Sequence, residues 1–144
     1  MAHRDDSVET IQQEMTAFAR RARASAARMH PELSLVSYTL LAHLDDQHGC
    51  RATDLAAHYL LDKSTVSRQI AALEKLGFVE RRIDPDDQRV QVLHPTEKGA
   101  QVLADVTARR RLAFRDRLAD WNEDDLDRFA TYLERYNAAR ERQD

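Results

Sequence analysis

Apolar residues recur every three or four positions through much of the chain, which is the spacing of one face of an amphipathic helix. The first stripe predicts a helix over residues 7–30, which Pro31 ends. Ser34 is a candidate N-cap for a second helix. The two stripes consist of Val8, Ile11, Met15, Phe18 and Ala22 in the first helix and of Leu35, Tyr38, Leu41 and Leu44 in the second.

Two shorter helices follow, and only a tight turn separates them. Gly49 ends the second helical region, and the third helix is predicted over residues 53–59. Asp62 is a candidate N-cap of the fourth helix, and Gly77 stands where a left-handed residue ends a helix. The predicted buried face of the fourth helix consists of Val66, Ile70, Leu73 and Leu76.

Helical spacing then gives way to alternation, which is typical of β-strands. Residues 78–83 and 89–94 alternate and are rich in β-branched side chains, and residues 84–88 between them favour a turn. These segments predict a two-stranded hairpin. An isolated hairpin is only marginally stable in water, so we expect this one to pack on the preceding helices.

Thr96 and Asn122 are candidate N-caps of two further helices, the first of which runs to about residue 118. The stripe of the last helix is Leu126, Phe129, Leu133 and Tyr136. The predicted fold is therefore mostly α with a small β-hairpin, in the order α-α-α-α-β-β-α-α. The first helix and the last two carry more apolar surface than so small a fold can bury, which favours pairing with a second copy of the chain.

Composition restricts the class of protein. The chain has 144 residues, enough for one domain, and a net charge of −3, which does not by itself indicate nucleic-acid binding. The only cysteine, Cys50, excludes an internal disulfide bond. We expect a cytoplasmic protein without a membrane segment, because the sequence lacks both a signal peptide and a run of about 18 apolar residues.

Two short helices, a tight turn and a hairpin together describe a winged helix-turn-helix, whose second helix fits the DNA major groove. The predicted recognition helix, residues 62–76, exposes hydroxyl, amide and basic side chains that can bond phosphates or base edges. An ordinary solvent-exposed helix has a similar polar face, so this helix alone does not distinguish a DNA-binding helix from an ordinary surface helix. The candidate DNA contacts are Lys63, Ser64, Thr65, Ser67, Arg68 and Gln69.

The hairpin favours DNA binding, with residues 83–91 as the wing. Arg89 lies just beyond the turn, where an arginine can enter a minor groove. The alternative role for Arg89 is a surface salt bridge. The two roles are compatible if Asp87, two residues away, orients the guanidinium of Arg89 toward the groove. Arg81 and Arg82 on the first strand are candidate phosphate contacts, unless one of them only faces solvent.

Residues 50–99 resemble the core of the MarR family of bacterial transcription regulators, and the helices on either side fit as well. The resemblance implies one domain over residues 1–144, with a winged helix-turn-helix lobe at 33–99 and dimerisation helices at 7–30 and 97–142. The matching residues are Leu55-Ala56, Ser64 to Arg68, Leu73-Glu74, Gly77, Val79, Arg81 or Arg82, Asp84, Asp87, Arg89, Thr96 and Gly99.

The resemblance implies a homodimer that binds double-stranded DNA at an inverted repeat, represses transcription and releases DNA when a small aromatic or phenolic effector binds. Two positions depart from the family pattern. Arg51 stands where a capping Thr or Ser is usual, and Gln88 replaces an arginine of the wing. Tyr38 and His43 are the candidate effector contacts, although both also suit a protein core.

Other chemistry finds less support in the sequence. Peroxide-sensing relatives carry their cysteine near the start of the first helix, whereas Cys50 lies outside that helix. His43 and His48 are five positions apart and do not share a helix face, so no metal or other cofactor is predicted. No nucleophile–base pair or phosphate-binding glycine loop indicates an enzyme. The near-neutral lobe keeps open a winged helix that binds protein and not DNA.

Overall fold

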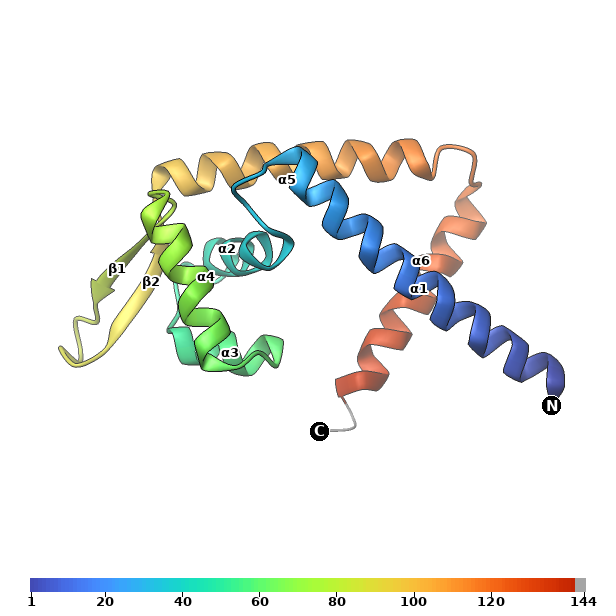
Figure 1. Cartoon of the computed structure of the whole chain (residues 1–144), viewed down its shortest axis with the longest axis horizontal. Helices are drawn as coiled ribbons and strands as arrows, with labels where there is room; N and C mark the ends of the chain where they lie inside the picture. The colour runs from blue at the N-terminus through green and yellow to red at the C-terminus, as the bar shows by residue number, and fades with distance from the viewer. Residues whose placement is uncertain (142–144) are drawn as a thin grey trace. The chain divides into compact units, whose positions relative to one another are not determined.

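The computed structural model describes residues 1–141 and confirms the predicted fold class and order of elements (Figure 1). The chain divides into two compact units, residues 1–107 and the part from Ala108 onward. None of the helices within residues 1–141 is long and apolar enough to cross a membrane. The elements are α1 (Ala2–Met29), α2 (Leu35–Asp46), α3 (Ala52–Tyr59), α4 (Lys63–Lys75), β1 (Val79–Ile83), β2 (Gln91–Pro95), α5 (Glu97–Arg117) and α6 (Glu123–Glu141).

The helix starts follow from cap chemistry. In each of four helices the predicted N-cap side chain accepts a hydrogen bond from the backbone N–H three residues later, at 2.8–3.1 Å. Helix α1 differs, because it begins at Ala2 and not at residue 7, without a side-chain cap. Its first turns are polar and add nothing to the apolar stripe, but they contain no helix breaker. The four confirmed caps are Ser34, Asp62, Thr96 and Asn122.

The core of the first unit lies between α2, α3, α4 and the hairpin. Helix α2 contributes three leucines without solvent exposure, and the predicted inner face of α4 is buried except for the half-buried Leu76. These contacts fix α4 against α2 and α3, so that its opposite face is presented to solvent. The core side chains of these elements are Leu40, Leu41, Leu44, Leu55, Val66, Ile70, Leu73, Phe78, Val79 and Leu93.

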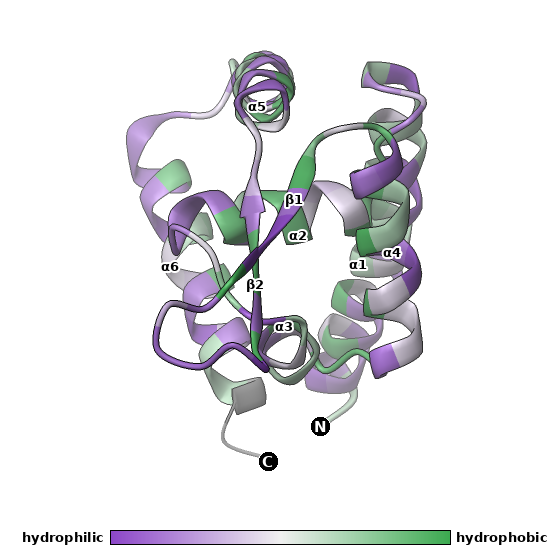
Figure 2. Cartoon of the chain, turned by 90° about the vertical axis from the view of Figure 1, so that its left-hand side faces the viewer, coloured by the Kyte–Doolittle hydropathy of each residue, from purple (hydrophilic) through white to green (hydrophobic). Residues whose placement is uncertain are grey.

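The hairpin is anchored at its root, as its marginal intrinsic stability requires. Strands β1 and β2 pair antiparallel, with Arg81 opposite Leu93. Leu93 is buried against the core and also exchanges two backbone hydrogen bonds with Cys50, at 3.1 and 2.8 Å. Figure 2 shows the two strands crossing over α2, with a hydrophilic loop at their far end. The wing therefore projects from a fixed base.

The C-terminal end of α4 is joined closely to the start of α5. Gly77 ends α4 with a left-handed φ of +80°, as predicted. Thr96 donates its hydroxyl to the Gly77 carbonyl at 2.5 Å, and Lys98 donates to the Leu76 carbonyl at 3.1 Å. Gly99 is required for this approach, because a Cβ there would collide with the backbone oxygen of Phe78. Both ends of α4 are thus held by specific bonds.

Apolar side chains remain exposed on α1 and in the second unit. On α1 these are Val8, Ile11 and Phe18, all more than half exposed. In the second unit the rings of Trp121 and Phe129 pack edge to face, with centroids 5.2 Å apart. The exposed apolar side chains of this unit are Leu112, Phe114, Trp121, Phe129, Tyr132, Leu133 and Tyr136.

Candidate nucleic-acid interface

The turn between α3 and α4 is as short as the sequence predicts. Leu60 follows α3 with a left-handed φ of +53°, and the Leu61 N–H donates to the Ala56 carbonyl at 3.0 Å. Asp62 then caps α4. Hydrogen bonds from the hydroxyl and the backbone N–H of Thr65 lower the pKa of Asp62, so its carboxylate stays ionised at neutral pH. The start of α4 is therefore fixed by a specific cap and by the backbone bond of the turn.

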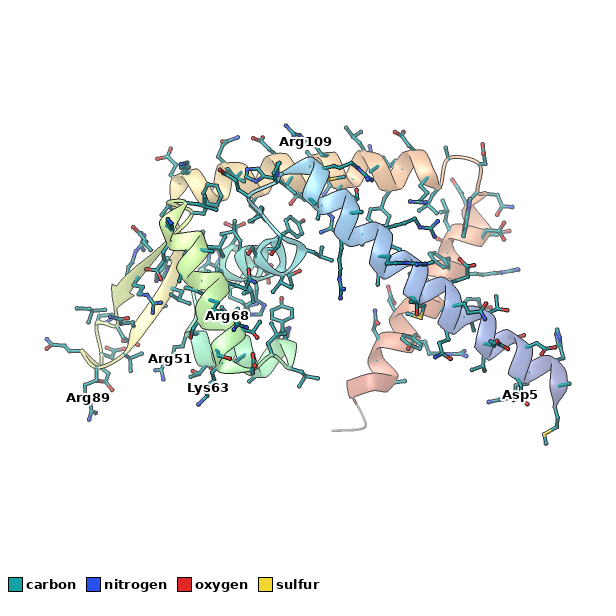
Figure 3. All side chains as sticks on the ribbon, in the orientation of Figure 1. Asp5, Arg51, Lys63, Arg68, Arg89 and Arg109 are labelled. Carbon is teal, nitrogen blue, oxygen red and sulfur yellow. The ribbon has the colours of Figure 1, made fainter. Side chains whose placement is uncertain are left out.

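The outer face of α4 carries most of the predicted contact residues at the surface. Lys63, Ser64, Ser67 and Arg68 are exposed, while Thr65 is half-buried. Arg68 donates from Nη2 to the Thr65 hydroxyl at 3.3 Å, a weak contact that leaves other guanidinium N–H groups for an external acceptor. Figure 3 shows Lys63 and Arg68 on the same helix.

Gln69 has a structural contact that the sequence did not reveal. Its Oε1 accepts a hydrogen bond from the buried Ser37 hydroxyl at 2.6 Å and a longer one from Ser34 at 3.4 Å. These bonds tie the middle of α4 to the first turn of α2. The amide oxygen of Gln69 is therefore engaged inside the lobe.

The contact between Asp87 and Arg89 is present as their spacing predicts. One oxygen of Asp87 accepts from the backbone N–H of Arg89 at 3.0 Å and from its Nε at 3.2 Å. These two bonds lower the pKa of Asp87, with the backbone bond as the larger cause. The Arg89 side chain is nonetheless 91% exposed. Its orientation is restrained while its outer N–H groups face solvent.

Asp84 shapes the loop before Arg89. It accepts a hydrogen bond from the Asp86 N–H at 2.8 Å, and its own N–H donates to the Val90 carbonyl at 2.9 Å. This is an Asx turn around Pro85. The wing acids therefore act as internal acceptors that set the shape of the loop.

Arg81 and Arg82 are exposed but already paired. Arg81 donates to Glu74 at 2.9 Å and, at 3.4 Å, to Gln91. Arg82 donates from Nε and Nη2 to the same oxygen of Glu80, at 2.9 and 2.6 Å. A phosphate at either position would compete with these carboxylates.

The candidate effector residues take part in bonds inside the first unit. The Tyr38 hydroxyl lies 3.0 Å from the Thr107 hydroxyl, and Nδ1 of His43 lies 3.1 Å from the Tyr59 hydroxyl. The rings of His43 and His58 lie 4.7 Å apart. In the described residues no group of three or more His, Cys, Asp and Glu side chains is placed to hold a metal ion.

Cys50 is half-buried and lies near Tyr59. Burial raises the pKa of its thiol, and the nearby Asp54 carboxylate adds to the effect. A higher pKa lowers the thiolate fraction, and the thiolate is the reactive form. The local field therefore makes Cys50 less nucleophilic.

These features define the chain as a winged helix-turn-helix DNA-binding protein. The sequence profile of the MarR family matches residues 33–90. The chain is 36% identical over 134 residues to the HTH-type transcriptional regulator YxaD of Bacillus subtilis (strain 168), covering 92% of this chain and 94% of that protein. It belongs to the MarR family of transcription regulators, which bind DNA and are not enzymes.

Solved structures give the same fold. A MarR family transcription regulator, SP03579, superposes with a TM-score of 0.84 at 19% identity, covering 100% of this chain and 99% of that chain. The crystal structure of MarR superposes with a TM-score of 0.81 at 23% identity, covering 92% of this chain and 91% of that one.

Proposed function

We propose that the chain is a homodimeric repressor that binds an inverted-repeat operator and is released by a small aromatic effector. The observation that carries the dimer is the exposed apolar surface of α1 and of the second unit. Ile11 is 53% exposed, and Tyr136 at the far end of the α6 stripe is 54% exposed. A second copy that covers these stripes would remove them from water, and exposed apolar surface of this kind is typical of an interface.

In this proposal α4 enters a major groove and the wing enters the adjacent minor groove. Lys63 and Arg68, with the hydroxyls of Ser64, Thr65 and Ser67, contact bases and phosphates. Two-fold symmetry then requires two half-sites about one helical turn apart. Gln69 contributes by holding α4 against α2.

At the wing, Arg89 enters the minor groove, because it is the most exposed of the three hairpin arginines and is oriented by Asp87. Arg81 and Arg82 contribute less as phosphate contacts, because each is bonded to a glutamate. The contribution of these arginines to binding is tested by the salt dependence of affinity. Each phosphate contact adds about 0.9 to the slope of log affinity against log salt concentration.

Two measurements test the dimer and the operator. Light scattering after size exclusion should give twice the mass of the 16.6 kDa chain. A gel shift with the DNA upstream of the gene should give a complex that disappears when either half of the inverted repeat is scrambled. A monomer in solution, or equal binding to the scrambled duplex, would contradict the proposal.

For the effector we propose a small phenol or aromatic acid near Tyr38 and His43. Their hydroxyl and imidazole groups bond Thr107 and Tyr59, and a ligand would take the place of these partners. Both residues lie in the lobe that carries α4. Titration calorimetry with benzoate and phenol should give heat that is absent in Tyr38→Phe. Heat that is equal in the variant would exclude this location, and release of DNA by the same compounds in a gel shift would support the regulatory role.

A further inference from the structure

Arg51 occupies the N-cap position of α3 without capping it, since its side chain makes no bond to the helix start. The main chain on its N-terminal side is fixed, because Cys50 exchanges two backbone hydrogen bonds with Leu93 of β2. Residue 51 is therefore held beside the root of the wing, where its side chain can reach the wing loop.

The side chain of Arg51 turns toward the acids of that loop. Its Nη2 lies 3.9 Å from Oδ2 of Asp84, whose other oxygen accepts from the Asp86 N–H. This distance is longer than a hydrogen bond, and the Arg51 side chain is 53% exposed. The carboxylate thus orients Arg51 without saturating its donors, in contrast to Arg82, which gives two N–H groups to Glu80.

The wing loop carries more acidic than basic side chains. Between Asp84 and Arg89 it has three aspartates and one arginine, and Gln88 adds no charge where the family pattern has an arginine. The positive field of Arg51 reaches the loop: after the two hydrogen bonds from Arg89, it is a further cause of the lowered pKa of Asp87.

Arg51 also lies where DNA would pass. Figure 3 shows Arg89, Arg51 and Lys63 along the same side of the first unit, with Arg51 between the wing tip and the start of α4. Guanidinium groups bind phosphate through charge-assisted hydrogen bonds. We infer that Arg51 contacts a backbone phosphate between the two grooves and supplies the cation that Gln88 lacks.

This inference rests on the proposed DNA complex, and one titration series tests both. Fluorescence anisotropy with the duplex from upstream of the gene is measured from 50 to 200 mM KCl for the wild type and Arg51→Gln. Removing one phosphate contact from each subunit of the dimer should lower the logarithmic salt slope by about 1.8. Over this range the affinity of the wild type should then fall about tenfold more than that of the variant. Arg4→Gln makes the same charge change in the exposed polar first turn of α1, outside the apolar stripe and the winged lobe, and should keep the wild-type slope.

A second background separates a phosphate contact from simple neutralisation of Asp84. In Asp84→Asn the carboxylate paired with Arg51 is neutral, so a slope decrease on adding Arg51→Gln cannot come from loss of that pair and is assigned to a contact with DNA. Persistence of the decrease supports the inference. An unchanged slope in Arg51→Gln, or a decrease that disappears in the Asp84→Asn background, overturns it. If the wild type binds this duplex at no salt concentration, the proposed operator itself is wrong. Thermal melts of each variant confirm that the lobe remains folded.

Discussion

Leu60 provides a direct test of the turn that positions α4. It is a non-glycine residue with φ of +53° and ψ of 40°, and the residue is 63% exposed. The left-handed region costs an L-residue about 1–2 kcal/mol, because Cβ approaches the following carbonyl. Glycine avoids this cost but loses about 0.5–1 kcal/mol to the greater freedom of the unfolded chain. For the backbone alone, Leu60→Gly should therefore give a net gain of roughly 0.5–1 kcal/mol.

Removal of the side chain acts in the opposite direction. About a third of the leucine is buried, and full burial is worth about 1.5–3 kcal/mol, so its removal costs roughly 0.5–1 kcal/mol. Leu60→Ala incurs this cost and keeps the strained backbone, whereas Leu60→Gly incurs it and removes the strain. We expect Leu60→Ala to be destabilised, and Leu60→Gly to match the wild type and exceed Leu60→Ala by roughly 0.5–1 kcal/mol.

Urea unfolding followed by circular dichroism at 222 nm measures the difference. All three proteins are compared at one concentration, because the stability of an oligomer depends on it. With an m-value of about 1–3 kcal/mol/M, the midpoint of Leu60→Gly should lie a few tenths of a molar above that of Leu60→Ala. In a helix interior alanine is the more stable of the two by about 1 kcal/mol. An alanine variant as stable as the glycine variant would refute the argument from strain.

Three further predictions concern the wing and the bonds that position α4. Arg89→Ala should lower the salt slope of DNA binding by about 1.8 per dimer, whereas Arg82→Ala, whose guanidinium is already paired, should change it by much less in the same anisotropy assay. Ser37→Ala should cost about 1 kcal/mol in urea unfolding, because it removes the hydrogen bond to Gln69, and an unchanged midpoint would contradict this. The Asp62 cap stabilises the fold above the ordinary Asp pKa of about 3.9, and its contribution disappears as pH falls through its lowered value, so Asp62→Asn should flatten the acid side of a stability–pH curve.

The local features of the fold could be predicted because their causes are local. Ser34, Asp62, Thr96 and Asn122 cap helices through bonds that span three residues, so composition and spacing suffice to find them. The bonds that Arg89 donates to Asp87 span two residues and can be predicted from spacing in the same way.

What the sequence did not reveal depends on the packing of distant segments. The bond from Ser37 to Gln69 joins residues 32 positions apart, and no local pattern separates such a glutamine from a solvent-exposed one. The approach of Arg51 to Asp84 likewise depends on the bridge between Cys50 and Leu93 of β2. Leu60 gave no turn signal, because a left-handed leucine lacks the Gly or Asn that usually marks one.

The acids of the lobe explain how a chain of net charge −3 belongs to a DNA-binding family. Glu74 and Glu80 are bonded to arginines of β1, and Asp87 is bonded to Arg89. A carboxylate that accepts hydrogen bonds from its own chain presents a weaker field to an approaching phosphate, because the partner cation or N–H dipole offsets its charge. Lys63 is not a member of these three pairs, and it lies at the exposed start of α4. Net charge counts all these groups equally, whereas binding depends on which of them face the groove with free donors.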